Sequence, residues 1–303
     1  MWAAAEVWPS IAETTVLEQA PEAISFGRRL AGRADSPAVR DARWRRTVIA
    51  GPVRRPAADL VTMAYVLGEL PPQVRADAVR SLAAGSGLVV LVEPGTPAGY
   101  ERIAAARDLL IELGLSVVAP CPHDRACPVP RGQDWCHFAE RLNRTALHRR
   151  IKVGTLGFED EKFCYVAAAR GARARAAGRV VRRPVRRKGL VSLRLCTEAD
   201  GMADATVSKR QGEAYRAARK TEWGAPWPPL PRGGADRPVR VLRSKDVLGA
   251  HVPHQRGHLQ HGKLADVADP HPARDRDAVR RGVVAGAGEM VGADHPPPVS
   301  CRD

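Results

Sequence analysis

The segment DLVTMAYVL at residues 59–67 decides the fold class of this chain. It is an apolar run of strand length, and a second run of the same kind, GLVVLV, follows at residues 87–92. Residues 72–83, between the two runs, carry apolar side chains at helical spacing. Buried strands that are separated by a helix are typical of a parallel sheet covered by helices.

The same alternation continues on both sides of this segment. Residues 96–114 predict a long helix that begins at Thr96, whose hydroxyl suits an N-cap, and residues 115–119 predict a further strand. Upstream, short β-prone runs lie at residues 14–17 and 48–50. The chain is therefore expected to contain an α/β domain built on a parallel sheet.

Three cysteines follow on a loop that is rich in proline. The motifs CPHDRACP at residues 121–128 and WCHF at residues 135–138 contain Cys121, Cys127 and Cys136. Thiolates that lie so close together after a strand can converge on one metal ion without disturbing a core. The spacing differs from that of a zinc ribbon, and the alternative is a set of buried free cysteines.

A basic region comes next. Between residues 141 and 190 there are fifteen Lys or Arg residues and three acidic ones. Residues 190–195 alternate apolar and polar side chains, which predicts a half-exposed strand. An uncompensated cationic band suits contacts with nucleic-acid phosphates, whereas the alternative is a solvated loop. The side chains expected to contact RNA are those of Arg182, Arg183, Arg186, Arg187 and Lys188.

The charge of the whole chain favours the same kind of partner. The 48 Lys and Arg outnumber the 33 Asp and Glu, which gives a net charge of +15 and favours a polyanion such as nucleic acid. No run of about 18 apolar residues occurs, so no transmembrane helix is expected, and residues 1–6 do not resemble a secretory signal. The six cysteines are therefore expected in a reducing compartment, as metal ligands or free thiols.

The composition changes after residue 228. Residues 229–303 contain no Phe, Tyr or Trp but six of the nine histidines, and Cys301 lies among them. Such a segment is expected to bury too little apolar surface to offset the entropy of ordering. Two explanations stay open, a disordered tail or an out-of-frame translation, and in both the segment is expected to add no packed core.

Several long motifs resemble one known family. They are APCPHDRACPVP (119–130), DWCHFAERLNR (134–144), LGFEDEKFCYVAAAR (156–170), RKGLVSLRLCT (187–197) and YRAARKTEWGAPWP (215–228). In this order they resemble the methyltransferase-like assembly proteins of the small ribosomal subunit, which include a mitochondrial small-subunit protein and bacterial relatives similar to rRNA methyltransferases. The resemblance covers residues 1–228.

The resemblance implies a class-I, S-adenosylmethionine-type sheet and a four-iron cluster. Carried over to this chain, the cluster ligands are Cys121, Cys127, Cys136 and Cys196. Four thiolates suit tetrahedral zinc equally well, so the choice of iron rests on the resemblance. Cys164 is expected in the core. His123 and His137 are either zinc ligands or, more often in such positions, outer-shell donors or RNA contacts.

A class-I methyltransferase holds its cofactor with a glycine-rich loop after its first strand. The opening MWAAAEVWPS resembles the helix that follows this loop, so the sheet is expected to be truncated at its N-terminus. Glu18 matches the acidic residue that binds the ribose of S-adenosylmethionine, and the alternative is an ordinary acidic strand end. Residues 68–71 carry no known catalytic motif, so the catalytic residues are unknown.

We therefore expect three regions: a truncated methyltransferase-like domain at residues 1–170, a basic β-rich region at 171–228 that completes the metal site, and the tail at 229–303. The expected function is that of an rRNA-binding factor in small-subunit assembly or translation, with an iron–sulfur cluster as its structural centre. The alternative is an active S-adenosylmethionine-dependent rRNA methyltransferase. The expected partners are small-subunit RNA and ribosomal proteins, with no membrane, and the protein is expected to be a monomer off the ribosome, in the bacterial cytoplasm.

Overall fold

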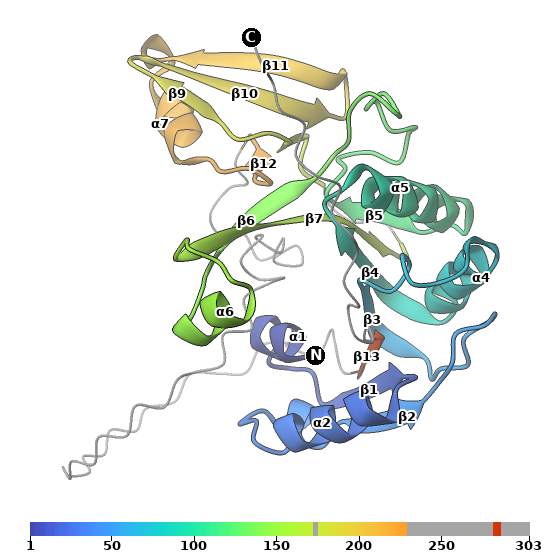
Figure 1. The fold of residues 1–303 in the computed structure, drawn as a ribbon. Coiled ribbons are helices and arrows are strands. Elements are labelled where there is room, and N and C mark those ends of the chain that lie inside the picture. The colour runs from blue at the N-terminus through green and yellow to red at the C-terminus, as the bar shows by residue number, and fades with distance from the viewer. Residues whose placement is uncertain (172–174, 229–280, 286–303) are drawn as a thin grey trace, which may run out of the picture.

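The computed structural model describes residues 1–171, 175–228 and 281–285, which form two β-sheets and the helices around them (Figure 1). The strands of the larger sheet are β1 (Glu13–Glu18), β2 (Arg43–Arg46), β3 (Ala58–Ala64), β4 (Ser86–Pro94), β5 (Ser116–Ala119), β6 (Phe138–Asn143), β7 (Phe158–Ala169) and β13 (Arg281–Ala285). Their order is β2-β1-β13-β3-β4-β7-β5, and β6 pairs with β7. The first five strands in this order are parallel, and β7 is antiparallel to both of its neighbours. The fold is thus α/β, as the sequence predicts.

The helices cover this sheet and connect its strands (Figure 1). They are α1 (Trp2–Val7), α2 (Pro21–Ala31), α3 (Pro37–Arg40), α4 (Pro72–Ala83), α5 (Pro97–Glu112), α6 (Ala146–Ile151) and α7 (Glu213–Lys220), with a 3-10 turn, η1 (Lys209–Gln211). Thr96 caps α5 as predicted, because its hydroxyl accepts a hydrogen bond from the amide of Gly99 at 3.0 Å. Within the described ranges no helix combines the length and the apolar character needed to cross a membrane.

The core of the large sheet consists of the apolar runs that the sequence indicates. Val61 of β3, Val89 of β4 and Val166 of β7 are completely buried, and Leu110 of α5 covers them in the same cluster. Parallel strands that are buried on both faces consist mainly of Val, Leu and Ile. This composition explains why residues 59–67 and 87–92 identify the sheet.

The second sheet contains β8 (Gly178–Val180), β9 (Val185–Arg187), β10 (Leu190–Thr197), β11 (Gly201–Ser208) and β12 (Pro226–Trp227). It has its own small core, in which Val180, Val191 and Leu193 are almost fully buried. The alternation at residues 190–195 predicts β10 correctly, since its burial alternates in the same way over most of the strand. Figure 1 shows this sheet beside the end of β6 and β7, away from β1 and β2.

One predicted strand is wrong in position. The β-prone residues at 48–50 lie in an extended segment without strand pairing, and the strand β2 is instead Arg43–Arg46. β2 is polar because it is an edge strand, which pairs with β1 on one side only. A strand in this place needs no apolar run, so propensity alone does not find it.

The most unexpected element is β13, which comes from the segment predicted to be an unpacked tail. It lies between β1 and β3, parallel to both, with Val284 opposite Val16 and Val283 opposite Val61. Residues 281–285 thus form a strand within the segment expected to stay unpacked, whereas residues 229–280 and 286–303 lie outside the described structure. In a doubly wound sheet of order 3-2-1-4-5, β13 holds the position of the first strand. Residues 281–285, from the C-terminal region, thus occupy the sheet position of the strand that was expected to be missing at the N-terminus.

We predict that a chain ending at Pro228 is less stable than the full chain. Loss of β13 leaves backbone amides and carbonyls of β1 and β3 without partners, at a cost of about 1 kcal/mol for each. The melting temperature is expected to fall by roughly 5 to 10 °C. A chain that lacks only residues 286–303 retains β13 and serves as the control, with a melting temperature close to that of the full chain. Equal melting temperatures for all three chains would contradict the placement of β13.

Candidate metal centre

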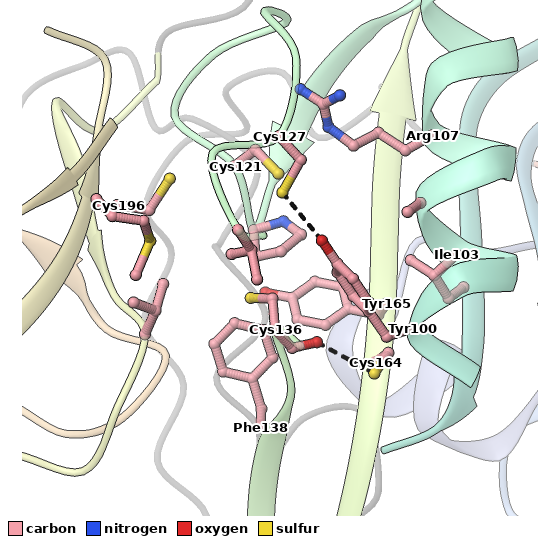
Figure 2. Close-up of a pocket in the computed structure, with 15 residues that line it drawn as sticks. Tyr100, Ile103, Arg107, Cys121, Cys127, Cys136, Phe138, Cys164, Tyr165 and Cys196 are labelled. Atoms are coloured by element: carbon pink, nitrogen blue, oxygen red, sulfur yellow. Dashed lines mark hydrogen bonds between the residues drawn. The ribbon is translucent and has the colours of Figure 1, made fainter. Parts of the chain in front are cut away.

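Four cysteines line one small cavity at the junction of the two sheets (Figure 2). Cys121 and Cys127 lie on the loop after β5, Cys136 lies two residues before β6, and Cys196 belongs to β10 of the second sheet. The cavity has a volume of about 40 Å³, and its remaining walls are mostly apolar. They are formed by Tyr100, Ile103, Ala104, Arg107, Pro120, Val129, Phe138, Cys164, Tyr165, Val181 and Met202. The four residues that the sequence predicts as ligands are therefore brought together from separate segments.

Two buried arginines fasten the cysteine loop to its surroundings. Arg107 of α5, only 3% exposed, donates to the carbonyls of His123 at 3.0 Å and Arg125 at 2.6 Å. Arg179 of β8, 2% exposed, donates to the carbonyl of Pro120 at 2.8 Å. Backbone carbonyls accept hydrogen bonds from both cations, and Arg107 also forms an ion pair with Asp108 at 2.8 Å; an unpaired buried charge would be very costly. The loop is thereby tied to both α5 and the second sheet.

A third arginine ties the loop farther along the chain. Arg182 donates to both carboxylate oxygens of Asp134 at 2.6 Å and to the carbonyl of Trp135 at 3.3 Å. Trp135 in turn donates through its indole N–H to the carbonyl of Gly95, at 3.0 Å. The two residues before Cys136 are therefore fixed by hydrogen bonds, to Arg182 on one side and to the carbonyl of Gly95 on the other.

Hydrogen bonds to neighbouring groups orient several of the thiols. The Tyr100 hydroxyl lies 3.3 Å from Sγ of Cys127, and Sγ of Cys196 lies 3.6 Å from Nε2 of His123. Cys164, buried in β7, donates to the carbonyl of Cys136 at 3.1 Å. Figure 2 shows these thiols around the space between α5 and β10. Cys164 is thus a core residue, as expected, that also contacts the cysteine loop.

Burial makes the thiols of this site hard to ionise. It raises the pKa of Cys136 well above its usual value, and negative charge on Cys121 and Cys127 would raise it further. Burial also raises the pKa of Cys196, to about 12. For Cys121 burial again raises the pKa, although the Arg107 guanidinium opposes this effect. Thiolates in such a cavity need a compensating cation, which a bound metal would supply.

The donor set fits a metal group in its chemistry, because four thiols and apolar walls are what iron–sulfur and structural zinc sites use. Within the described residues, however, no three His, Cys, Asp or Glu side chains are grouped as a metal-binding cluster. His123 has a buried Nδ1 without a hydrogen-bond partner in the described residues, and the pKa of its ring is lowered mainly by burial. The metal-ligand roles of these residues stay predictions.

Glu18 lies at the end of β1 and is buried. Its Oε1 accepts hydrogen bonds from the amides of Gln19 at 2.7 Å and Ala20 at 2.9 Å, directly before α2 begins at Pro21. The carboxylate therefore satisfies amides at the start of a helix. Its predicted contact with a cofactor ribose is not tested by this geometry.

The candidate RNA-binding arginines fall into two groups. Arg182 and Arg186 are engaged within the protein, Arg186 with the carbonyls of Arg219 at 3.0 Å and Thr221 at 2.5 Å. Arg183, Arg187 and Lys188 are exposed, and their side chains form no hydrogen bond or ion pair in the part of the chain that the structure describes. The charge of Arg183 nevertheless reaches Asp160, whose pKa is lowered mainly by its hydrogen bond with Arg141 and to a smaller extent by Arg183. This second group is therefore the one that a ligand can reach. Arg187 belongs to β9, Arg183 precedes this strand and Lys188 lies in the turn that leads to β10.

A buried ion pair beside Gly68 is not predicted from the sequence. Glu93 of β4, 1% exposed, accepts a hydrogen bond from Arg102 of α5 at 2.7 Å. A Cβ at Gly68 would lie 3.0 Å from Nη2 of Arg102 and 3.2 Å from Oε2 of Glu93. The glycine thus leaves room for the pair. The one signal in the sequence is an acidic residue within an otherwise apolar strand.

Comparison with known proteins identifies the family of this chain. The family model described as mitochondrial small ribosomal subunit Rsm22 matches residues 1–228, and the chain belongs to this family. Human mitochondrial ribosome assembly protein METTL17 is 31% identical over 181 residues, which cover 55% of this chain and 38% of METTL17. The mitochondrial Rsm22-cox11 tandem protein 2 of Schizosaccharomyces pombe is 27% identical over 184 residues, 47% of this chain and 24% of that protein. The chain thus matches well under half the length of these relatives.

The comparisons confirm the expected family and correct the expected location. The relatives carry names that place them in ribosome assembly or in the small-subunit family, as the motifs predict. The same names are mitochondrial, which contradicts the prediction of a bacterial cytoplasmic protein. That prediction rested on the absence of an export signal, a feature that does not distinguish these compartments.

Arg182 and Arg183 provide a matched test of whether Arg182 stabilises the position of the cysteine loop. Arg182→Gln removes the contacts with Asp134 and Trp135, whereas Arg183→Gln changes the same charge at an exposed position. The first variant is expected to lose about 1 to 3 kcal/mol of unfolding free energy and the second less than about 0.5 kcal/mol. Urea denaturation measures both. Equal losses would show that Arg182 does not anchor the cysteine loop.

Proposed function

We propose that this protein is an RNA-binding factor in the assembly of the small ribosomal subunit, with an iron–sulfur cluster as its structural centre. The observation that carries the proposal is the cavity where Cys121, Cys127, Cys136 and Cys196 meet between two sheets. Membership in a small-subunit family supports the ribosomal part of the proposal. Small-subunit RNA and ribosomal proteins are the partners that follow from it.

The four cysteines would hold the cluster, and Cys196 gives it a structural role. Three of the thiols belong to the loop that leads to β6, whereas Cys196 belongs to β10. A cluster bound to all four would therefore cross-link the large sheet to the second sheet, as structural metal sites do in small domains. Tetrahedral zinc, the alternative for four thiolates, would make the same connection.

The exposed hairpin provides the contact with RNA in this proposal. Arg183, Arg187 and Lys188 are exposed, and none of their side chains forms an ion pair with a described acidic residue. The turn between β9 and β10 contains Gly189 with φ +75°, which holds the hairpin tight. Arg182, next to Arg183, connects this hairpin to the cysteine loop through Asp134. Loss of the metal would therefore disturb the orientation of the RNA-binding residues.

A second candidate function is methyl transfer from S-adenosylmethionine, and one observation favours it. β13 fills the position of the first strand, so that the carboxyl ends of β1, β13 and β3 lie side by side, with Glu18 at the end of β1. Ligands of doubly wound sheets bind at this place. Calorimetric titration of the full chain with S-adenosylmethionine separates an active methyltransferase from a scaffold, which would give no heat of binding.

We predict that Gln substitutions at Arg183, Arg187 and Lys188 together weaken binding to transcribed small-subunit RNA. Each lost phosphate contact should reduce the log–log slope of affinity against salt concentration by about 0.7 to 0.9. A variant with Lys at positions 183 and 187 retains the charges and serves as the control, with a slope close to that of the original protein. Filter binding at several salt concentrations measures the slopes. An unchanged slope in a folded Gln variant would refute the role of the hairpin.

A further inference from the structure

A second cationic region lies far from the hairpin in the chain. Residues 28–55 contain nine arginines and two aspartates, with no other charged residues. Several of the arginines belong to β2 and to the segment that follows it. The density of positive charge is similar to that of residues 141–190.

These arginines surround an open pocket at the edge of the large sheet. Its volume is about 470 Å³, and its lining consists of Arg45, Arg46, Thr47, Arg54, Arg55 and Pro56. No acidic residue contributes to this lining. The pocket is therefore a concave surface whose polar groups are guanidinium groups, a hydroxyl and backbone.

The arginines of the pocket differ in what they already bind. Arg55 donates to the carbonyls of Ser81 at 3.2 Å and Leu82 at 2.6 Å, so it is fixed to the end of α4. Arg46 donates to the carbonyl of Gln19 at 3.3 Å. Arg45 and Arg54, in contrast, are exposed, and neither guanidinium group has an ion-pair or hydrogen-bond partner among the residues described.

We propose that this pocket binds phosphate groups of the RNA backbone, through Arg45 and Arg54, as a second contact surface. The inference rests on the proposed function, because RNA is the ligand that both surfaces share. Guanidinium groups match the geometry of phosphate oxygens and form charge-assisted hydrogen bonds with them. Two unpaired guanidinium groups that line one pocket can both bind one phosphate. Arg55, whose side chain is held by backbone carbonyls, forms part of the same lining.

The pocket binds the backbone and not the bases. The aromatic residue nearest in sequence, Trp44, is directed toward α2, since its ring lies 2.2 Å from the position that a Cβ at Gly27 would take. It is therefore not free to stack on a base. Contacts to phosphates position an RNA without reading its sequence, so this surface contributes affinity that is largely independent of sequence.

Edge strands commonly carry charged side chains that prevent pairing with other sheets, and this role is the alternative for Arg45. It does not account for Arg54, which lies outside β2 and yet lines the same pocket. The pocket is also distant from the hairpin. Figure 1 shows β2 at one end of the molecule and β9 and β10 at the other. The two surfaces would therefore contact different segments of one RNA, with independent effects.

The test compares the full chain with Arg45→Gln/Arg54→Gln in filter binding to transcribed small-subunit RNA. Two lost contacts should reduce the log–log salt slope by about 1.4 to 1.8 and weaken binding on the order of tenfold at low salt. The control, Arg29→Gln/Arg33→Gln, removes the same charge from exposed positions on and after α2. It should change the slope by less than half as much. Arg45→Lys/Arg54→Lys should retain most of the slope.

Each outcome is decisive once both Gln variants keep the melting temperature of the original protein. If the two Gln variants weaken binding equally, the effect is one of net charge and the pocket has no specific role. If the hairpin variant loses RNA affinity and the pocket variant does not, the proposed function stands and this inference is wrong. If the original protein binds pyrophosphate in the pocket by calorimetry but no RNA, the ligand is a free polyphosphate, and both proposals are overturned.

Discussion

The structure depends on three arginines that fasten one loop between two sheets. Arg107, Arg179 and Arg182 donate to carbonyls and a carboxylate of the loop that carries Cys121, Cys127 and Cys136. Loops of this length are usually mobile, because they bury little apolar surface. Here Val129 of the loop packs in the main core, and charge-assisted hydrogen bonds from arginines of α5 and of the second sheet hold the loop as well. The thiols consequently line one cavity, and the second sheet supplies the fourth of them.

This arrangement separates the basic residues by task. In the sequence these arginines form one basic band. In the structure some of them stabilise the fold, whereas others lie on the surface. Arg182 and Arg183 are adjacent and chemically identical, yet the first contacts Asp134 and the second contacts solvent. The same division separates Arg55 from Arg54 at the edge of the large sheet. The net charge of +15 therefore overstates the cationic surface that is available to RNA.

The parts of the fold that follow from local pattern could be predicted from the sequence. The buried strands near residues 59–67 and 87–92 were predictable because both of their faces are apolar, and the helix after Thr96 because it has a cap. β2 could not be predicted, because an edge strand needs no apolar run. β13 could not be predicted either, because its pairing with β1 joins distant parts of the chain. The grouping of Cys121, Cys127 and Cys136 follows from their spacing, but the approach of Cys196 depends on tertiary packing that no spacing encodes. The family resemblance supplied that residue.

The central claim is that these four cysteines hold an iron–sulfur cluster, and metal analysis of anaerobically purified protein tests it most directly. The account predicts roughly four iron and four sulfide per chain, with most of the iron lost on substituting Ser at position 121, 127, 136 or 196. Cys164→Ser, a buried thiol beside the same cavity, is the matched control and should retain the iron. Stoichiometric zinc without iron, or full iron in the four ligand variants, would contradict the claim.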